Sequence, residues 1–446
     1  MMRTLLLALT ATATAVAGTN DLPSPLDING AIRYSLDHNY SILQARQQVQ
    51  VQDGLVTQVT GQALPNVAAN GQYARNASEI SQSFPQSTNS WVAQVKVTQL
   101  VFAGGSVRAG VEAAHLNRSA AVADLQSAIN LALLDVRTKF YNVILTKEQV
   151  QVQEDNVKLF TRELNDTRNQ FQAGSVSNFE VLRARVSLAN AQPDLITARN
   201  NYRVAIEQLR QSLGAPSGIA GVTSDPDVEG TLDFTPSQFD LDQALSQART
   251  SRPELSSLQK HSEAGEQGVK QARGGYLPTL SVFGEYEWEG EGGFTESPSQ
   301  FESFGFPVNA SVHGWMYGVQ GNWSIFDGGT TRGKVHQAQA QREIDRLSQS
   351  SEELSIDVEV RQAFSTFEQA RELVAASKET VDQATEALRL ANERFHVGSA
   401  TQLDVLTSQV ALTQAKTNQV QANYNYIVAV AALRKAMGLS DVAVGT

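Results

Sequence analysis

The chain has 446 residues, of which 41% are hydrophobic, and its formal net charge is −11 at pH 7. This acidic balance argues against a nucleic-acid partner, which a basic surface would bind. The chain contains no cysteine, and this excludes a disulfide framework, a thiolate metal site and a lipid-modified cysteine.

The N-terminus has the pattern of a secretory signal peptide, which we assign to residues 1–17. Arg3 precedes the apolar run 5–9, and the small residues 15–17 precede Gly18. Its removal makes the mature chain one unit more acidic, because the segment holds one basic residue and no acid. No later apolar stretch reaches about 18 residues, so the sequence predicts no transmembrane helix.

The rest of the sequence is an internal duplication. After a Gly-Gly pair in each half, equivalent residues such as Phe140 and Phe364 lie 224 positions apart. Before that pair the offset is 213, as between Ala31 and Ala244. A constant register of this kind indicates two copies of one structural unit. We divide the chain into a first repeat at 18–213, a linker at 214–238, a second repeat at 239–438 and a tail at 439–446.

Each repeat has the same order of predicted elements. A helix at 27–61 or 241–273 ends at a Leu-Pro pair that cannot continue it. A strand pair follows, at 66–102 and 279–326, and then a Gly-Gly pair. A long helix, a glycine turn and a return helix complete each repeat as helical hairpins over 106–213 and 330–437. Residues 106–173 form one unbroken run, about 100 Å of helix at ~1.5 Å per residue.

The predicted strands alternate between apolar and polar residues. In the second repeat one face carries Leu280, Val282, Tyr286, Trp288, Tyr317, Val319, Trp323 and Ile325. Alternation over about ten residues with aromatic side chains is typical of outer-membrane barrel strands. Four strands cannot close a membrane barrel, which needs about eight or more, so several chains would have to combine. A small soluble β-domain packed on a helix is the alternative.

These features together resemble the TolC-like outer-membrane factors over residues 21–439. The most specific motifs are Phe-Ala-Gly-Gly-Ser at 102–106, Phe-Asp-Gly-Gly-Thr at 326–330 and Val-Gly-Ser-Ala-Thr-Gln-Leu-Asp-Val-Leu at 397–406. The resemblance implies a membrane α+β fold, a trimeric outer-membrane β-barrel with four strands per chain that continues into a long α-helical coiled-coil barrel. It implies a protein of the outer membrane that spans the periplasm.

The function implied by the resemblance is a passive exit duct of a tripartite efflux pump or a type I secretion system. Its partners would be two further copies of the chain, a periplasmic adaptor protein, an inner-membrane transporter and outer-membrane lipid. The alternative is a secreted structural coiled-coil protein, such as a filament or surface component. Two aromatic strand pairs at equivalent repeat positions favour the duct. The sequence does not specify the cargo.

Nothing in the sequence indicates an enzyme, a cofactor or a metal site. The six histidines lack ligand spacing, and we find neither a nucleophile elbow nor paired catalytic carboxylates. Residues 328–335 match a phosphate-binding loop except for its final Ser/Thr, but the equivalent segment 104–111 has no lysine. We therefore reject a nucleotide site.

The two Gly-Gly pairs mark the points at which a strand is followed by a long helix. Glycine tolerates the positive φ that such a change of direction requires, and we expect Ser106 and Thr330 to cap the helices. We assign these pairs as the junction between barrel and helices. They are Gly104, Gly105, Gly328 and Gly329.

The glycine turns between the long helices are ordinary helix–helix turns by their chemistry. The resemblance makes them candidates for docking the adaptor protein. Their central residues are Gly174, Ser175, Gly398 and Ser399.

Glu180 and Asp404 are repeat partners that follow these turns. Ser177 with Glu180, and Thr401 with Asp404, have the spacing of a capping box. The resemblance adds that Asp404, with Thr407 one turn later, lines the periplasmic gate. Some relatives hold that gate shut through polar side-chain links, but the matching residues here cannot form them. The sequence therefore does not show how the gate is held shut. The matching residues are Phe179, Phe395 and Ala400.

Overall fold

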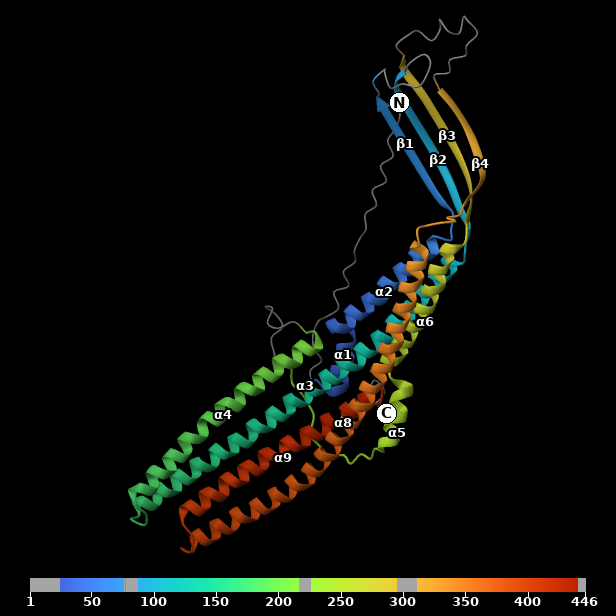
Figure 1. Cartoon of the computed structure of the whole chain (residues 1–446). Coiled ribbons are helices and arrows are strands. Elements are labelled where there is room, and N and C mark those ends of the chain that lie inside the picture. The colour runs from blue at the N-terminus through green and yellow to red at the C-terminus, as the bar shows by residue number, and fades with distance from the viewer. Residues whose placement is uncertain (1–24, 76, 78–86, 216–225, 295–310, 440–446) are drawn as a thin grey trace, which may run out of the picture. The chain divides into compact units, whose positions relative to one another are not determined.

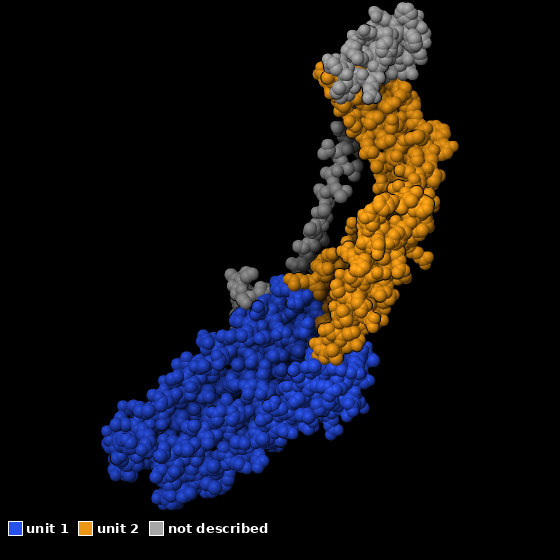
Figure 2. All heavy atoms as spheres, viewed as in Figure 1, with its two compact units in different colours: residues 1–43, 128–251, 357–446 blue, residues 44–127, 252–356 orange. Residues whose placement is uncertain are grey.

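The computed structural model describes residues 25–75, 77, 87–215, 226–294 and 311–439 (Figure 1). The predicted signal peptide and nearly all of the predicted tail lie outside these residues. The chain divides into two compact units (Figure 2). The helical unit comprises residues 1–43, 128–251 and 357–446, and the sheet unit comprises 44–127 and 252–356. Helices α3 (Ser106–Gln172) and α8 (Thr330–His396), of 67 residues each, contribute to both.

In the helical unit, α3 forms a hairpin with α4 (Asn178–Leu213), and α8 forms one with α9 (Gln402–Ala436) (Figure 1). A first hydrophobic cluster packs α3 and α4 against α1 (Ile28–His38), with Phe140 and Leu209 fully buried. Three residues of the predicted linker, Ala215, Val228 and Leu232, belong to this cluster. Parts of the linker are therefore in the core.

A second cluster joins α8 to α9 around Phe367 and Tyr426. The Tyr426 hydroxyl accepts a hydrogen bond from the Ser237 amide and donates one to the Thr235 carbonyl, both at 2.9 Å. The phenol thereby fastens the linker to this hairpin while both of its polar capacities are satisfied. Among the described residues, no helix combines the length and the apolar character needed to cross a membrane.

The prediction of one helix before each strand pair is wrong, because each is broken into two. In the first repeat α1 and α2 (Tyr40–Gly61) are separated by Asn39, which has extended backbone angles. Its side-chain oxygen accepts from the Ser41 amide at 2.9 Å and its nitrogen donates to the Ser212 carbonyl at 2.7 Å. The asparagine thus caps α2 while it is held by α4.

In the second repeat the break between α5 (Leu241–Ser251) and α6 (Pro253–Arg273) falls at Arg252. Arg252 has extended backbone angles because it precedes Pro253, whose ring disfavours helical geometry in the preceding residue. The proline itself is the first residue of α6, where its missing N–H costs nothing.

The sheet unit contains one antiparallel sheet in the order β1-β2-β3-β4. The strands are β1 (Asn66–Arg75), β2 (Ser87–Ala103), β3 (Thr279–Phe294) and β4 (Ser311–Asn322). The β2–β3 pairing joins the two repeats into a single sheet. β1 and β4 form its two edges.

β4 ends four residues earlier than predicted. Its last residue, Asn322, pairs with Thr279, the first residue of β3. The residue before Thr279 is Pro278, which has no N–H with which to extend the ladder. Trp323 therefore lies outside the strand, and its indole N–H donates to the Tyr276 carbonyl at 3.2 Å.

The register divides the sheet into an apolar and a polar face. Rows of paired residues on the apolar face run Val95–Tyr286–Trp315, Val97–Gly284–Tyr317 and Gln99–Val282–Val319. This places Tyr286, Trp288, Tyr317 and Val319 on one face, as predicted, whereas Trp323 is not a strand residue. Tyr317 and Val319 are each 73% exposed. An exposed face of this composition suits contact with lipid.

We expect Val319→Arg to impair insertion and Gln320→Arg to be tolerated. Val319 lies on the apolar face, where arginine costs about 2–4 kcal/mol near the bilayer midplane, whereas Gln320 lies on the opposite face. The measurement is the amount of folded, heat-modifiable protein in the outer-membrane fraction. Equal insertion of both variants would show that the two faces of β4 have been assigned the wrong way round.

Candidate functional site

The turn between α8 and α9 is closed by a Schellman hydrogen-bond pattern. Gly398 has a φ of 76°, and its N–H donates to the Phe395 carbonyl at 3.0 Å. The Ser399 N–H donates to the Arg394 carbonyl at 2.8 Å. A left-handed glycine followed by these two bonds satisfies the last carbonyls of a helix. The α3–α4 turn repeats both bonds, at Gly174 and Ser175.

The predicted capping box at the start of α9 is confirmed. The Thr401 amide donates to the Asp404 carboxylate at 2.8 Å, and the Asp404 amide donates to the Thr401 hydroxyl oxygen at 3.3 Å. The bond from the Thr401 amide is the main cause of a lowered pKa for Asp404. Because the pKa is depressed, the cap stabilises the helix at neutral pH and is lost only as pH falls through that lowered pKa.

The capping box predicted for the first repeat is wrong. Ser177 is the N-cap residue of α4, but its side chain makes no capping hydrogen bond. The carboxylate of Glu180 instead forms an ion pair with Arg183 at 3.2 Å. Arg183 is one turn further along α4 and also stacks over the Phe179 ring, 4.7 Å from its centroid. In the second repeat the residue equivalent to Arg183 is Thr407. Because threonine carries no charge, the Asp404 carboxylate has no such ion pair and caps α9 instead.

A buried glutamine joins the start of α9 to α3. Gln402 is 6% exposed, and its amide nitrogen donates to the Glu163 carboxylate at 2.7 Å and to the Thr167 hydroxyl at 3.0 Å. Thr167 is itself buried. These bonds satisfy polar groups that would otherwise be stranded between two helices.

The polar contact continues along both helices. Gln409, seven residues after Gln402, is 2% exposed, and Thr413 donates to the Asn156 side-chain oxygen at 3.1 Å. Seven residues are about two helical turns, so these side chains form one stripe. Leu406 packs on Phe160 within it. We call this stripe the polar seam, formed by Gln402, Gln409 and Thr413 of α9 with Glu163, Thr167 and Asn156 of α3.

The two predicted gate residues lie on the opposite, exposed face of α9. Asp404 and Thr407 share this face with Leu403 and Val410, and both of these apolar residues are more than half exposed. The Thr407 hydroxyl donates to the Leu403 carbonyl of its own helix at 2.8 Å. The donor of this hydroxyl is therefore already used within the helix, and its oxygen can still accept. One side of α9 therefore carries the polar seam, and the opposite side is exposed.

The sequence analysis missed Gln402 and Gln409. Their signal was present, because two glutamines seven residues apart fall at the buried phase of an amphipathic helix. A polar residue at a buried position needs a partner. The partners Glu163 and Thr167 lie more than 230 positions away in the sequence, so periodicity alone could not identify them.

Both Gly-Gly junctions have a left-handed backbone, and the first is also closely packed. Gly104 has a φ of 60°, and a Cβ there would lie 2.6 Å from the Gly274 carbonyl oxygen. Gly328 has the same kind of backbone, with a φ of 66°, but no neighbour within 4 Å of such a Cβ. The first junction therefore requires glycine for space as well as for backbone angle.

Ser106 and Thr330 do not cap the long helices as predicted. Both are the first helical residues, and their hydroxyls donate to the carbonyls three residues earlier, at 2.7 and 2.9 Å. In the second repeat Asp327 is the cap, since its carboxylate accepts from the Gly329 and Thr331 amides at 2.9 and 2.7 Å. The equivalent residue of the first repeat is Ala103, which has no such group.

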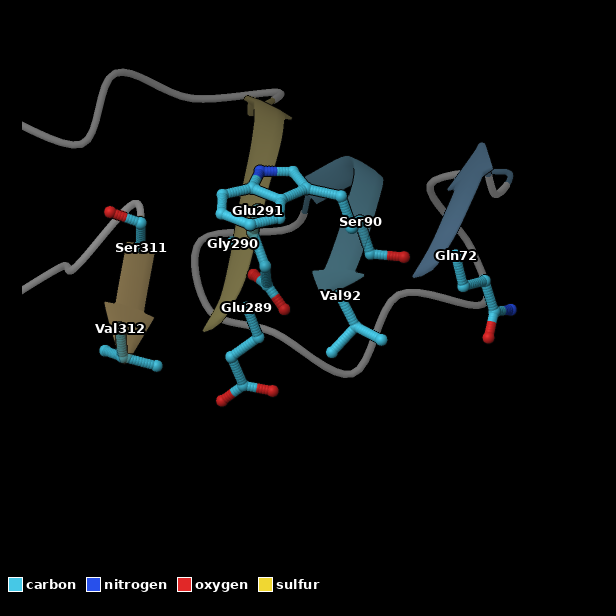
Figure 3. Close-up of a pocket in the computed structure, with 9 residues that line it drawn as sticks. Gln72, Ser90, Val92, Glu289, Gly290, Glu291, Ser311 and Val312 are labelled. Carbon is cyan, nitrogen blue, oxygen red and sulfur yellow. The ribbon is translucent and has the colours of Figure 1, made fainter. Parts of the chain in front are cut away.

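The polar face of the sheet is acidic. Four glutamates alternate along β3 on this face, at positions 285, 287, 289 and 291. Lys96 pairs with Glu285 at 2.8 Å and is the one cation on this face among the described strand residues. Figure 3 shows the Glu289 side chain on the same side of the sheet as Val92 and Val312, its neighbours in register.

Within the described residues, no group of three or more His, Asp or Glu side chains could hold a metal ion. The site is thus a set of surfaces: two helical turns, the exposed face of α9, the polar seam and the acidic face of the sheet.

A sheet with one apolar face, joined to two very long helical hairpins, defines an outer-membrane channel. The family model "Outer membrane efflux protein" matches residues 31–215 and 244–439. The chain therefore belongs to the outer membrane efflux protein family. The matched segments begin 213 positions apart and end 224 apart, the same offsets that define the repeat.

Individual relatives are similar at low identity over most of the chain. Outer membrane protein TolC of Escherichia coli is 24% identical over 365 residues, covering 79% of this chain and 70% of that protein. Outer membrane efflux protein BepC of Brucella suis is 24% identical over 412 residues, covering 92% and 85%. The solved CmeC outer membrane channel of Campylobacter jejuni has a TM-score of 0.76 at 17% identity, covering 92% of this chain and 85% of that one.

The predicted fold class is confirmed by these findings. The chain contributes its strands to an outer-membrane β-barrel that continues into a helical barrel across the periplasm. It is an outer-membrane channel for efflux or type I secretion, and a secreted filament protein does not fit this family. The family consists of transport proteins.

We expect Gln402→Ala to destabilise the helical unit by about 1–3 kcal/mol, because it removes two buried hydrogen bonds, one to the Glu163 carboxylate and one to the Thr167 hydroxyl, and leaves the carboxylate without its donor. The measurement is the thermal unfolding of the detergent-solubilised protein, followed by circular dichroism. Gln414→Ala is the matched control, since Gln414 is an exposed glutamine on the same helix. Equal effects of the two changes would show that the polar seam adds no stability.

Proposed function

We propose that three copies of this chain form a passive exit duct that works with a periplasmic adaptor protein and an inner-membrane transporter. The open sheet carries this proposal. β1 and β4 each have one side without a partner strand in the described chain, and an unpaired backbone group in lipid costs on the order of a few kcal/mol. Four strands from each of three copies give twelve, enough to close a barrel.

The domain division predicted from the sequence forms part of this proposal. Residues 1–17 would be removed on export, and the repeats at 18–213 and 239–438 would each supply two strands and one helical hairpin. The linker at 214–238 would bind the repeats together through its packing on α3 and α9. Residues 439–446 would remain a tail.

The proposal is tested by reconstituting the purified protein into planar lipid bilayers, together with native mass spectrometry. A duct gives discrete conductance steps and a mass of three chains. The absence of conductance in samples that contain intact trimers would reject the channel, whereas conductance from another oligomer would reject only the trimer.

The helical turns are proposed to dock the adaptor. A Cβ built on Gly174 or Gly398 meets no atom within 4 Å, so both turns present open surface. Figure 1 places both turns at the same end of the helical unit. A partner that fits there would touch the backbone of Ser175 and Ser399 as well.

We expect Ser399→Trp to abolish export and to leave the trimer and its membrane insertion intact. The bulky ring would occupy the surface beside Gly398, whereas Ser399→Ala removes only the hydroxyl contact to the Arg394 carbonyl. Export is measured as resistance to a pump substrate, alongside the amount of trimer in outer membranes. Loss of trimer in Ser399→Trp would indicate that this turn serves only the fold.

The gate is proposed to lie at the exposed face of α9, with Asp404 and Thr407 towards the duct axis. The polar seam on the opposite side of α9 would hold this helix against α3 while the entrance is closed. A seam of hydrogen bonds can exchange its partners for water when the helices separate, at a lower cost than an apolar seam. The bonds that would act as the latch are those of Gln402 and Thr413 to α3, in place of side-chain links from Phe179, Phe395 or Ala400.

We expect Asp404→Asn to reduce cation preference and divalent-cation block in planar bilayers. Three carboxylates around a narrow mouth attract cations, and asparagine removes the charge while its oxygen can still cap α9. Thermal stability should therefore change little. The acidic face of β3 would keep part of the preference. Unaltered selectivity and block would return Asp404 to the role of a helix cap alone.

A further inference from the structure

The surface around the Gly-Gly junctions combines large exposed apolar side chains with unpaired cations. We call it the junction patch. Its apolar members are Phe102, Tyr276, Trp323, Ile325 and Phe326, and its cations are Arg108, Lys270, Arg273, Arg332 and Lys334. We propose that the junction patch binds anionic phospholipids of the periplasmic leaflet of the outer membrane.

The apolar members continue the lipid-facing surface of the sheet beyond its last strand residues. Ile325 and Phe326 are 84% and 88% exposed, and they follow β4 directly. The bond from Trp323 to the Tyr276 carbonyl holds this segment against the 3₁₀ turn η2 (Gly274–Tyr276) that precedes β3. Aromatic side chains at this boundary are typical of the membrane–water interface.

The cations of the patch have no protein partners. None of the five forms an ion pair or a hydrogen bond among the residues that the structure describes. The nearest carboxylate in sequence to Arg332 is Asp327, and it is occupied by the Gly329 and Thr331 amides. A cluster of five cations is unusual in a chain of net charge −11. Their charges are available to an anion from outside the chain.

Some exposed cations elsewhere on the same helices are paired. Further along α3, Arg118 binds the carboxylate of Asp53. On α8, Arg389 binds both Glu386 and Glu393. Neither α3 nor α8 has an acidic residue in its first turn. The first turns of both long helices therefore hold a cation, Arg108 or Arg332, and no carboxylate in the same turn.

One part of the patch has the shape that a lipid requires. A groove of about 580 Å³ runs beside the end of β2 and the start of α3. Leu100, Phe102, Val107 and Val111 give it apolar walls, and Arg108 and one carboxylate, that of Glu112, also line it. An acyl chain would fit the walls, and a guanidinium can bind phosphate oxygens in a bidentate manner.

Charge complementarity favours a lipid over a second copy of the chain. Arg108 and Arg332 are repeat equivalents, so a ring of copies would carry cations at both junctions of every chain. Copies meeting through these surfaces would bring like charges together. Anionic headgroups neutralise them, and basic residues beside a membrane attract such lipids. The proposal rests on the outer-membrane location and needs neither the adaptor nor the gate.

The test measures binding of a fluorescent phosphatidylglycerol to the full-length protein in detergent, with phosphatidylcholine of the same acyl chains as the comparison. The variant is Arg108→Gln, Arg332→Gln and Lys334→Gln combined. We expect the wild type to prefer phosphatidylglycerol by at least about 100-fold. The triple variant should weaken that binding by roughly 100-fold, at about fivefold for each basic residue, and should bind phosphatidylcholine unchanged.

The control combines Arg185→Gln, Arg203→Gln and Lys378→Gln, which removes the same charge from exposed positions on α4 and α8. It should keep the preference. Equal binding of the two lipids by the wild type would overturn the proposal, as would equal losses in both triple variants. A loss of assembly in the first variant would also overturn it, since these cations would then belong to a contact between copies.

Discussion

Backbone hydrogen bonding in lipid is the constraint on which the rest of this structure depends. A sheet of four strands leaves the outer edges of β1 and β4 open, and lipid offers no groups to pair with them. The chain is therefore incomplete as a membrane protein until further strands close the ring. Each long hairpin follows a strand pair directly through a Gly-Gly junction, so any ring of strands also arranges the helices that follow.

The helical hairpins are stabilised differently from a globular core. Hydrophobic clusters around Phe140 and Phe367 are small and lie beside the linker, whereas the α3–α9 contact near the turns contains the polar seam. Buried apolar contacts are strong and insensitive to direction, but hydrogen bonds between helices fix register and can be exchanged for water. Near the turns, hydrogen bonds thus act together with the smaller apolar clusters of α3, α4 and α9.

Charge is distributed in bands that match the environments of a channel. The sheet has an apolar face towards lipid and an acidic face with Glu285, Glu287, Glu289 and Glu291. The junction patch is basic, and Asp404 brings negative charge to the helical turns. The faces of the sheet can be specified residue by residue because side chains alternate along a strand, whereas the junction patch draws its residues from several elements.

The sequence by itself determined the repeat, the two long helices, the strand pairs and their faces, and the positive-φ glycines at 104, 105, 328 and 329. These features follow from local rules: periods of two and 3.6 residues, and the freedom of glycine. Only the tertiary structure decided the helix breaks at Asn39 and Arg252, the ion pair that Glu180 forms with Arg183 in place of a cap, and the partners of Gln402. Asn39 is held by Ser212, and Gln402 by Glu163. Such contacts join residues far apart in sequence. The pairing of buried polar groups depends on how whole helices pack, and local sequence patterns carry no information about that packing.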